Sequence, residues 1–96
     1  MADTRRHARF KLEVDVTVRS TRLGPIPGFS IEISESGVSA TLPIELRVGE
    51  TVELHINLPF GSVDLQAVVR NRNAFRHGFE FSDNNVARQL VERYLH

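Results

Sequence analysis

Hydrophobic and polar residues alternate with a period of two along most of the chain. Every second residue from Phe10 to Val18 is apolar, and the residues between them are polar or charged. The same pattern recurs from Val52 to Leu58 and from Val63 to Val69. Alternation that is rich in β-branched residues indicates strands with one buried face. These three segments are therefore predicted to be strands.

Three shorter segments show the same pattern and bring the number of predicted strands to six. Phe29, Ile31 and Ile33 alternate with polar residues, and we expect them to face the core. Val38–Leu42 is predicted to be a short strand that Pro43 ends, and Gly78–Phe81 is predicted to be the last strand.

The segments between the strands contain glycine and proline, which interrupt regular structure. Leu23–Gly28 is predicted to be a turn between the first two strands. A turn centred near Gly24-Pro25 would place Arg9 across from about residue 39, within a few residues of Ser34–Gly37. Gly37 is a residue free to take positive φ. Further connections are predicted at residues 43–50 and 59–62.

The period changes near the C-terminus, where residues 83–95 place apolar side chains three or four residues apart. This spacing predicts an amphipathic helix of about three turns, with Asp83 or Asn84 as its N-cap. Six short strands followed by one helix predict a mainly β fold, a six-stranded antiparallel barrel with a C-terminal helix. Residues 10–82 would form the barrel, and residues 1–9 a flexible basic segment.

The composition limits the kinds of protein that the chain can be. A length of 96 residues fits one domain spanning 1–96. There is no cysteine, so disulfides and cysteine-based metal sites are excluded, and the four histidines lack metal-ligand spacing. No apolar run reaches the roughly 18 residues that a membrane helix needs. The N-terminus does not resemble a signal peptide, so a cytoplasmic location is expected.

Charge is unevenly distributed, although the formal net charge is zero. Residues 1–22 hold six Lys or Arg against three Asp or Glu, whereas residues 23–69 hold one against six. A nearly neutral chain is a poor candidate for binding a nucleic acid polymer. A local basic site for one small anion remains compatible with this distribution.

Two short polar segments carry the candidate chemistry. The N-terminal arginines present planar guanidinium groups, which pair with phosphate oxygens or with the O6/N7 edge of guanine. The second segment offers a carboxylate that can accept hydrogen bonds from guanine N1–H and N2–H, a hydroxyl, and a glycine that permits close approach. Together they suit a ligand with both guanine and phosphate. The candidate ligand-binding residues are Arg5, Arg6, Arg9, Glu32, Ser34 and Gly37.

The pattern Arg5-x-x-x-Arg9, followed by Glu32-x-Ser34-x-x-Gly37, resembles the two-part signature of PilZ domains. The resemblance extends over nearly the whole chain and includes residues 42–50 and 77–81. It implies a six-stranded antiparallel barrel with a C-terminal helix that binds cyclic di-GMP in bacteria. Glu32 stands where the family usually has Asp or Asn.

The leading interpretation is a non-enzymatic cyclic di-GMP receptor that uses no cofactor or metal. Binding would order residues 1–9 and so signal to a protein partner whose identity the sequence does not give. The alternative is a PilZ-like adaptor that binds a protein and no nucleotide, which the substitution at Glu32 favours. No catalytic constellation supports an enzyme. A single-stranded nucleic acid barrel with an aromatic platform is disfavoured, because alternation places most of these aromatic residues in the core: Phe29, Phe60, Phe75, Phe79 and Phe81.

Overall fold

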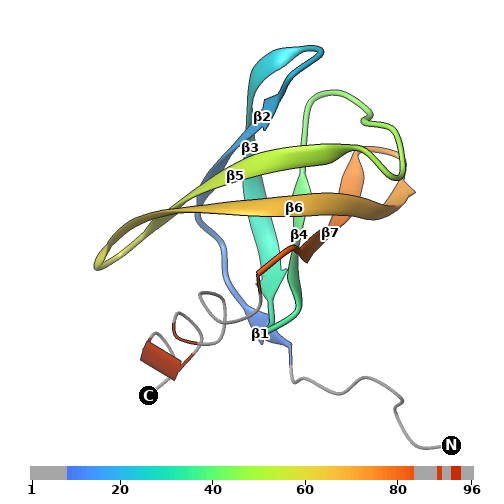
Figure 1. Cartoon of the computed structure of the whole chain (residues 1–96). Helices are drawn as coiled ribbons and strands as arrows, with labels where there is room; N and C mark the ends of the chain where they lie inside the picture. Colours follow the sequence, from blue (N-terminus) through green and yellow to red (C-terminus); the bar gives the residue numbers. More distant parts are fainter. Residues whose placement is uncertain (1–8, 84–88, 90–91, 94–96) are drawn as a thin grey trace, which may run out of the picture.

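The computed structural model describes residues 9–83, 89, 92 and 93, and this part of the chain forms seven strands (Figure 1). The mainly β fold that the alternation predicts is confirmed. The strands are β1 (Phe10–Lys11), β2 (Asp15–Ser20), β3 (Gly24–Ile33), β4 (Gly37–Thr41), β5 (Thr51–Leu58), β6 (Gly61–Asn73) and β7 (Arg76–Phe81).

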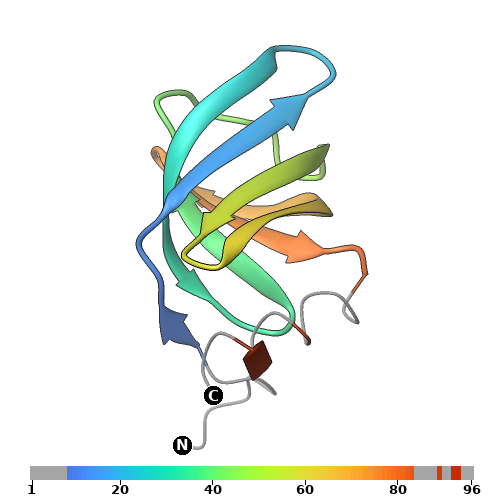
Figure 2. The same cartoon turned by 90° about the vertical axis from the view of Figure 1, so that its left-hand side faces the viewer.

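Six of the strands close into an antiparallel barrel. They are hydrogen-bonded in the order β3-β2-β5-β6-β7-β4, and β4 then pairs with β3 to complete the ring. The short β1 is added beside the last residues of β3, at the end of the barrel opposite the β2–β3 turn (Figures 1 and 2). The predicted six-stranded antiparallel barrel is confirmed, with this one extra strand.

The barrel interior is filled by the alternating apolar residues of the strands. Val16 and Val18 on β2 are at most 1% exposed, as are Leu54 and Ile56 on β5. Burial of an aliphatic side chain of this size contributes roughly 1.5–3 kcal/mol to the free energy of unfolding. The period-two pattern therefore identified the inward faces of these strands correctly.

The predicted first strand is interrupted because Ser30 of β3 points inward between its two halves. The Ser30 hydroxyl accepts a hydrogen bond from the Val14 N–H at 3.0 Å and donates one to the Leu12 carbonyl. The side chain thus takes the place of part of the backbone ladder at residues 12–14, although the Leu12 N–H still bonds to the Ile31 carbonyl, and the segment divides into β1 and β2. The predicted alternation nevertheless holds, since Leu12 is buried and Val14 is partly buried.

A β-bulge in β3 changes which of its residues face the core. Ser30 pairs with Ala40 but Glu32 pairs with Ser39, so Ile31 is the extra residue. Ahead of the bulge the inward positions belong to even-numbered residues. Phe29, expected in the core, is 63% exposed.

The expectation that most of the five phenylalanines are buried was also wrong. Phe60 and Phe75 lie in or beside the hairpin connections and are 46% and 50% exposed. Phe79 and Phe81, which alternate on β7, are buried. Alternation thus predicted the burial of the two phenylalanines on β7 correctly. It failed for Phe60 and Phe75 near turns and for Phe29 before the bulge.

The predicted turn at Leu23–Gly28 was wrong, because β3 already begins at Gly24 and the turn occupies residues 21–23. The Ser30 N–H donates to the Val14 carbonyl, so even-numbered residues here direct their backbone groups toward β2. Pro25 and Pro27 therefore face the other edge, where β4 pairs with β3 only from Phe29 onward. A proline on an unpaired edge removes no sheet hydrogen bond, so the segment can be a strand.

Side chains hold the connection between β4 and β5 against the barrel. The His77 Nε2 accepts a hydrogen bond from the Leu46 N–H, and Arg72 donates to the Leu46 carbonyl, both at 2.9 Å. At the end of the connection, the Ser20 hydroxyl donates to the Glu50 carboxylate at 2.6 Å. This hydrogen bond is the main reason that the pKa of Glu50 is lowered from its ordinary value of 4.5. The predicted loop at residues 43–50 is confirmed.

The two ends of the chain fall largely outside the described residues. The predicted flexible segment 1–9 is described only at Arg9, and the helix predicted at residues 83–95 stays a prediction. Gln89, Glu92 and Arg93 are helical in conformation, and the Arg93 guanidinium lies 5.3 Å from the centroid of the Phe60 ring. Within the described residues, no helix has the length and apolar character needed to span a membrane.

Candidate functional site

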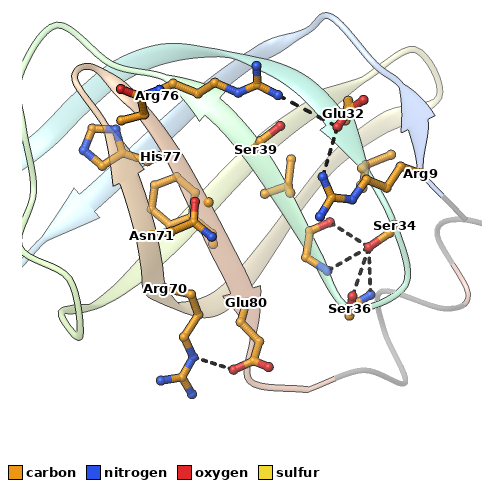
Figure 3. Close-up of a pocket in the computed structure, with 16 residues that line it drawn as sticks. Arg9, Glu32, Ser34, Ser36, Ser39, Arg70, Asn71, Arg76, His77 and Glu80 are labelled. Carbon is orange, nitrogen blue, oxygen red and sulfur yellow. Dashed lines mark hydrogen bonds and ion pairs between the residues drawn. The ribbon is translucent and has the colours of Figure 1, made fainter. Parts of the chain in front are cut away.

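An open cavity of about 600 Å³ lies on the outer face of the barrel, over neighbouring parts of β3, β4, β7 and β6 (Figure 3). One row of paired residues crosses it: Glu32 pairs with Ser39, Ser39 with Gly78, and Gly78 with Asn71. Gly78 has no side chain and Ser39 has a short one. These two residues leave the middle of the row low, although the Asn71 carboxamide lies against Gly78, where it would meet an added Cβ.

Charged residues surround the hollow and form ion pairs with one another. The Glu32 carboxylate lies 3.6 Å from the Arg9 guanidinium and 3.9 Å from that of Arg76. Arg70 and Glu80 form a separate pair at 2.6 Å. All five side chains are more than one-third exposed, and exposed pairs of this kind contribute at most about 1 kcal/mol. A bound anion could therefore replace a carboxylate as the arginines' partner at little cost.

Ser34 organises the β3–β4 turn at one edge of the cavity. Its hydroxyl accepts hydrogen bonds from the N–H groups of Ser36 and Gly37 at 3.2 and 3.3 Å. The Ser34 N–H also donates to the Gly37 carbonyl at 2.8 Å. The side chain is only 8% exposed. Its first role is thus to fix the shape of this turn.

Gly37 is required by the packing of β4 against β7. A Cβ at this position would overlap the backbone carbonyl oxygen of Phe79. Gly37 does not use its freedom to take positive φ, since the glycines with positive φ among the described residues are Gly24, Gly49 and Gly61. The sequence pattern thus pointed to a residue that must be glycine, but the reason is contact between two strands.

The observed register brings Arg9 to the β3–β4 turn. Phe10 pairs with Ile33 and Lys11 with Glu32, so Arg9 precedes this ladder at the level of Ser34. The predicted partner near residue 39 was about five positions away, because the β2–β3 turn lies earlier than expected. Four of the six candidate residues, Arg9, Glu32, Ser34 and Gly37, line the cavity, whereas Arg5 and Arg6 lie outside the described residues.

Sequence reasoning missed the wall that β6 and β7 contribute. The run from Arg70 to Asn73 breaks the alternation of β6 with consecutive exposed residues, and Gly78 occupies an outward position on β7. Both are visible in the sequence, but nothing local shows that β7 pairs with β4. The cavity residues missed in this way include Arg70, Asn71, Asn73, Arg76, Gly78 and Glu80, and Ser39 on β4 was missed as well.

His77 supports the site from the interior of the barrel. Its side chain is fully buried, stacks on Phe79 with ring centroids 6.0 Å apart, and donates from Nδ1 to the Phe75 carbonyl at 2.9 Å. Because Nε2 accepts from the backbone of Leu46, the imidazole is neutral, and burial lowers its pKa below 6.5. In the described part of the chain, no group of three acidic, histidine or cysteine side chains could hold a metal ion.

These features define a small closed antiparallel barrel with a cavity on its surface. The cavity is lined by arginines, by carboxylates and by the paired strands β4 and β7, each of which contributes a glycine. The chain belongs to the PilZ domain family, whose family model matches residues 3–96. A comparison with curated proteins found no match.

Solved structures, two of them described as PilZ domains, share this fold at low sequence identity. The PilZ domain of YcgR from Escherichia coli with c-di-GMP has a TM-score of 0.83 and 18% identity, over 97% of this chain and 90% of that one. The Bacillus subtilis inhibitor of motility MotI/DgrA has a TM-score of 0.79 and 21% identity, over 98% of this chain and 51% of that one. The PilZ domain of CeSA from a cellulose-synthesizing bacterium has a TM-score of 0.77 and 18% identity, over 93% and 99%.

Proposed function

We propose that this domain is a cyclic di-GMP receptor that binds its ligand in the cavity on β3, β4, β6 and β7. The observation that carries the proposal is the position of Arg9, the described end of the first motif, 3.6 Å from Glu32 of the second motif and beside the Ser34 turn. Membership of the PilZ family supports it, as do two YcgR structures that contain c-di-GMP. The proposed activity is binding, without a catalytic step, metal or cofactor.

The arginines and Glu32 bind different groups of the ligand. Arg9, joined by Arg5 and Arg6 from the N-terminal segment, binds phosphate oxygens and the O6/N7 edge of guanine through paired guanidinium donors. Glu32 accepts hydrogen bonds from guanine N1–H and N2–H. Because its present partners are exposed arginines, the carboxylate exchanges a weak ion pair for hydrogen bonds to the base.

The β3–β4 turn positions these groups, and the N-terminal segment carries the signal. Ser34 holds the turn through its hydrogen bonds to Ser36 and Gly37, so the adjoining backbone keeps a fixed shape. Ligand binding orders residues 1–9 against the barrel, which changes the surface offered to a downstream protein. Amide hydrogen exchange should show protection of residues 1–9 only with ligand. Equal exchange in both states would contradict this signalling step.

Calorimetric titration tests the proposed receptor directly. Cyclic di-GMP should bind with a dissociation constant on the order of micromolar, about −8 kcal/mol. GTP and cyclic di-AMP should bind far more weakly, because the carboxylate and guanidinium groups match guanine edges. Absence of binding heat at about 100 micromolar protein, or equal binding of cyclic di-AMP, would contradict the proposal.

A second candidate function, a protein adaptor that binds no nucleotide, is favoured by one observation at Glu32. This carboxylate already bridges Arg9 and Arg76, and its extra methylene relative to Asp extends it toward both. An adaptor of this kind would keep the ion pairs closed and use the barrel surface for a protein partner. Replacement of Glu32 distinguishes the two functions, as described in the Discussion.

A further inference from the structure

Ser39 lies in the middle of the row that crosses the cavity, between Glu32 on β3 and Gly78 on β7. Its Oγ exposes less than 1 Å² and has no hydrogen-bond partner within the part of the chain that the structure describes. Most buried hydroxyls in proteins are hydrogen-bonded, and an unpaired one is destabilising.

The other buried serines of the described chain follow this rule. Ser20 bonds to Glu50, Ser30 to the backbone of residues 12 and 14, and Ser34 to the backbone of its own turn. Ser39 lines the cavity, as Ser34 does, but it differs from all three in having no hydrogen-bond partner among the described residues (Figure 3). The oxygen is buried and the described fold gives it no partner, so a ligand group that reached it in the cavity would supply the missing hydrogen bond.

We infer that Ser39 is a specificity-determining residue, whose hydroxyl accepts a hydrogen bond from the exocyclic amino group of a guanine bound by Glu32. The inference rests on the proposed function. Residues paired directly across two strands have Cβ atoms about 4.5–5.5 Å apart, so Ser39 and Glu32 can both reach one edge of a base. The carboxylate takes N1–H and one hydrogen of the amino group. The second amino hydrogen is left for Ser39.

A nucleobase that lacks the exocyclic amino group provides the comparison for this assignment. Adenine has no amino group at C2, and neither does hypoxanthine, which otherwise keeps the N1–H of guanine. Cyclic di-inosine monophosphate therefore differs from cyclic di-GMP only in the amino group, of which one hydrogen is assigned to Glu32 and the other to Ser39.

Titrations of both ligands into three variants test the assignment. Ser39→Ala should weaken cyclic di-GMP binding about 5- to 10-fold, as expected for loss of one neutral hydrogen bond, but change cyclic di-inosine monophosphate binding by less than about 2-fold. Ser39→Thr keeps the hydroxyl and should retain selectivity for guanine. Ser62→Ala removes an exposed serine at the start of β6, outside the cavity, and should leave both affinities unchanged.

The outcomes separate this inference from the proposed function. If the wild type does not bind cyclic di-GMP, the proposed function fails and the inference fails with it. If the wild type binds and Ser39→Ala binds equally well, or loses both ligands equally, only the Ser39 assignment is overturned. The unliganded Ser39→Ala variant should melt no lower than the wild type. A lower melting temperature would show a structural hydroxyl and would also overturn the assignment.

Discussion

His77 and Leu46 are joined by a hydrogen bond in which the buried imidazole Nε2 accepts the backbone N–H at 2.9 Å. The bond connects β7, which forms one wall of the cavity, to the long connection before β5. It requires a neutral imidazole, because a protonated Nε2 has no lone pair to accept with. Stability of the barrel is therefore linked to the protonation state of one side chain.

Acid should destabilise the protein from about pH 6.5 downward. The pKa of His77 is lowered by burial, so below pH 6.5 the unfolded chain binds a proton that the folded chain does not. The free energy of unfolding should be constant near pH 7.5 and decline below pH 6.5 by up to about 1.4 kcal/mol per pH unit. Urea unfolding between pH 5 and 8 measures this, above the range in which the lowered pKa of Glu50 acts.

Two histidine variants identify the group responsible. His77→Gln should be less stable at pH 7.5 but should lose the decline between pH 6.5 and 5. His55→Gln removes a partly exposed surface histidine that pairs with Asp64, and it should retain the decline caused by His77. An unchanged decline in His77→Gln would show that another group binds the proton.

Arg9→Ala should weaken cyclic di-GMP binding by roughly 1.5–3 kcal/mol, the contribution of hydrogen bonds to a charged group. Stability should hardly change, because the Arg9–Glu32 pair is half-exposed. Arg19→Ala is the matched control, since Arg19 forms an equally exposed pair with Glu53 outside the cavity. Calorimetry that gives the same affinity for both variants would remove Arg9 from the site.

Glu32 distinguishes receptor from adaptor. If the carboxylate binds guanine, Glu32→Asp should keep or increase the affinity, and Glu32→Ala should lower it by roughly 1.5–3 kcal/mol. Glu53→Ala, which removes an exposed carboxylate that pairs with Arg19 outside the cavity, should leave the affinity unchanged. Binding by Glu32→Asp but not by the wild type would favour the adaptor. Full binding by Glu32→Ala would mean that the arginines alone recognise the ligand.

Gly37→Ala should destabilise the fold itself. The added methyl group would meet the Phe79 carbonyl oxygen, and the strands would have to separate, at a cost of about 1–3 kcal/mol in unfolding free energy. Ser36→Ala, at the preceding residue, removes only a partly buried hydroxyl bonded to Ser34 and should cost less than about 1 kcal/mol. Thermal unfolding at pH 7.5 compares the two. Equal melting temperatures would refute the packing explanation.

The alternation of residues 52–58 and 63–69 predicted β5 and most of β6, since inward and outward positions repeat without interruption there. The same reasoning failed at Phe29, because a bulge after Ser30 changes which residues of β3 face the core, and a pairing irregularity of this kind has no signal in the alternation. It failed again at Pro25, where proline was taken to interrupt a strand although its missing N–H faces an edge.

The candidate site was predictable in part for a similar reason. Arg9 and Glu32 come from adjacent segments of the chain, so any antiparallel return brings them together despite an error in register. Arg76 and Gly78 reach the cavity only through the closure of β7 on β4, a long-range pairing with no local sequence signal.

The two prolines of β3 also bear on how the domain behaves at high concentration. An unpaired strand edge normally offers alternating donors and acceptors on which another chain can extend the sheet. At Pro25 and Pro27 this edge of β3 presents carbonyl oxygens without the matching donors. A second molecule therefore cannot form a regular ladder along this stretch. The residues that first suggested a break in the structure instead protect the barrel against edge-to-edge polymerisation.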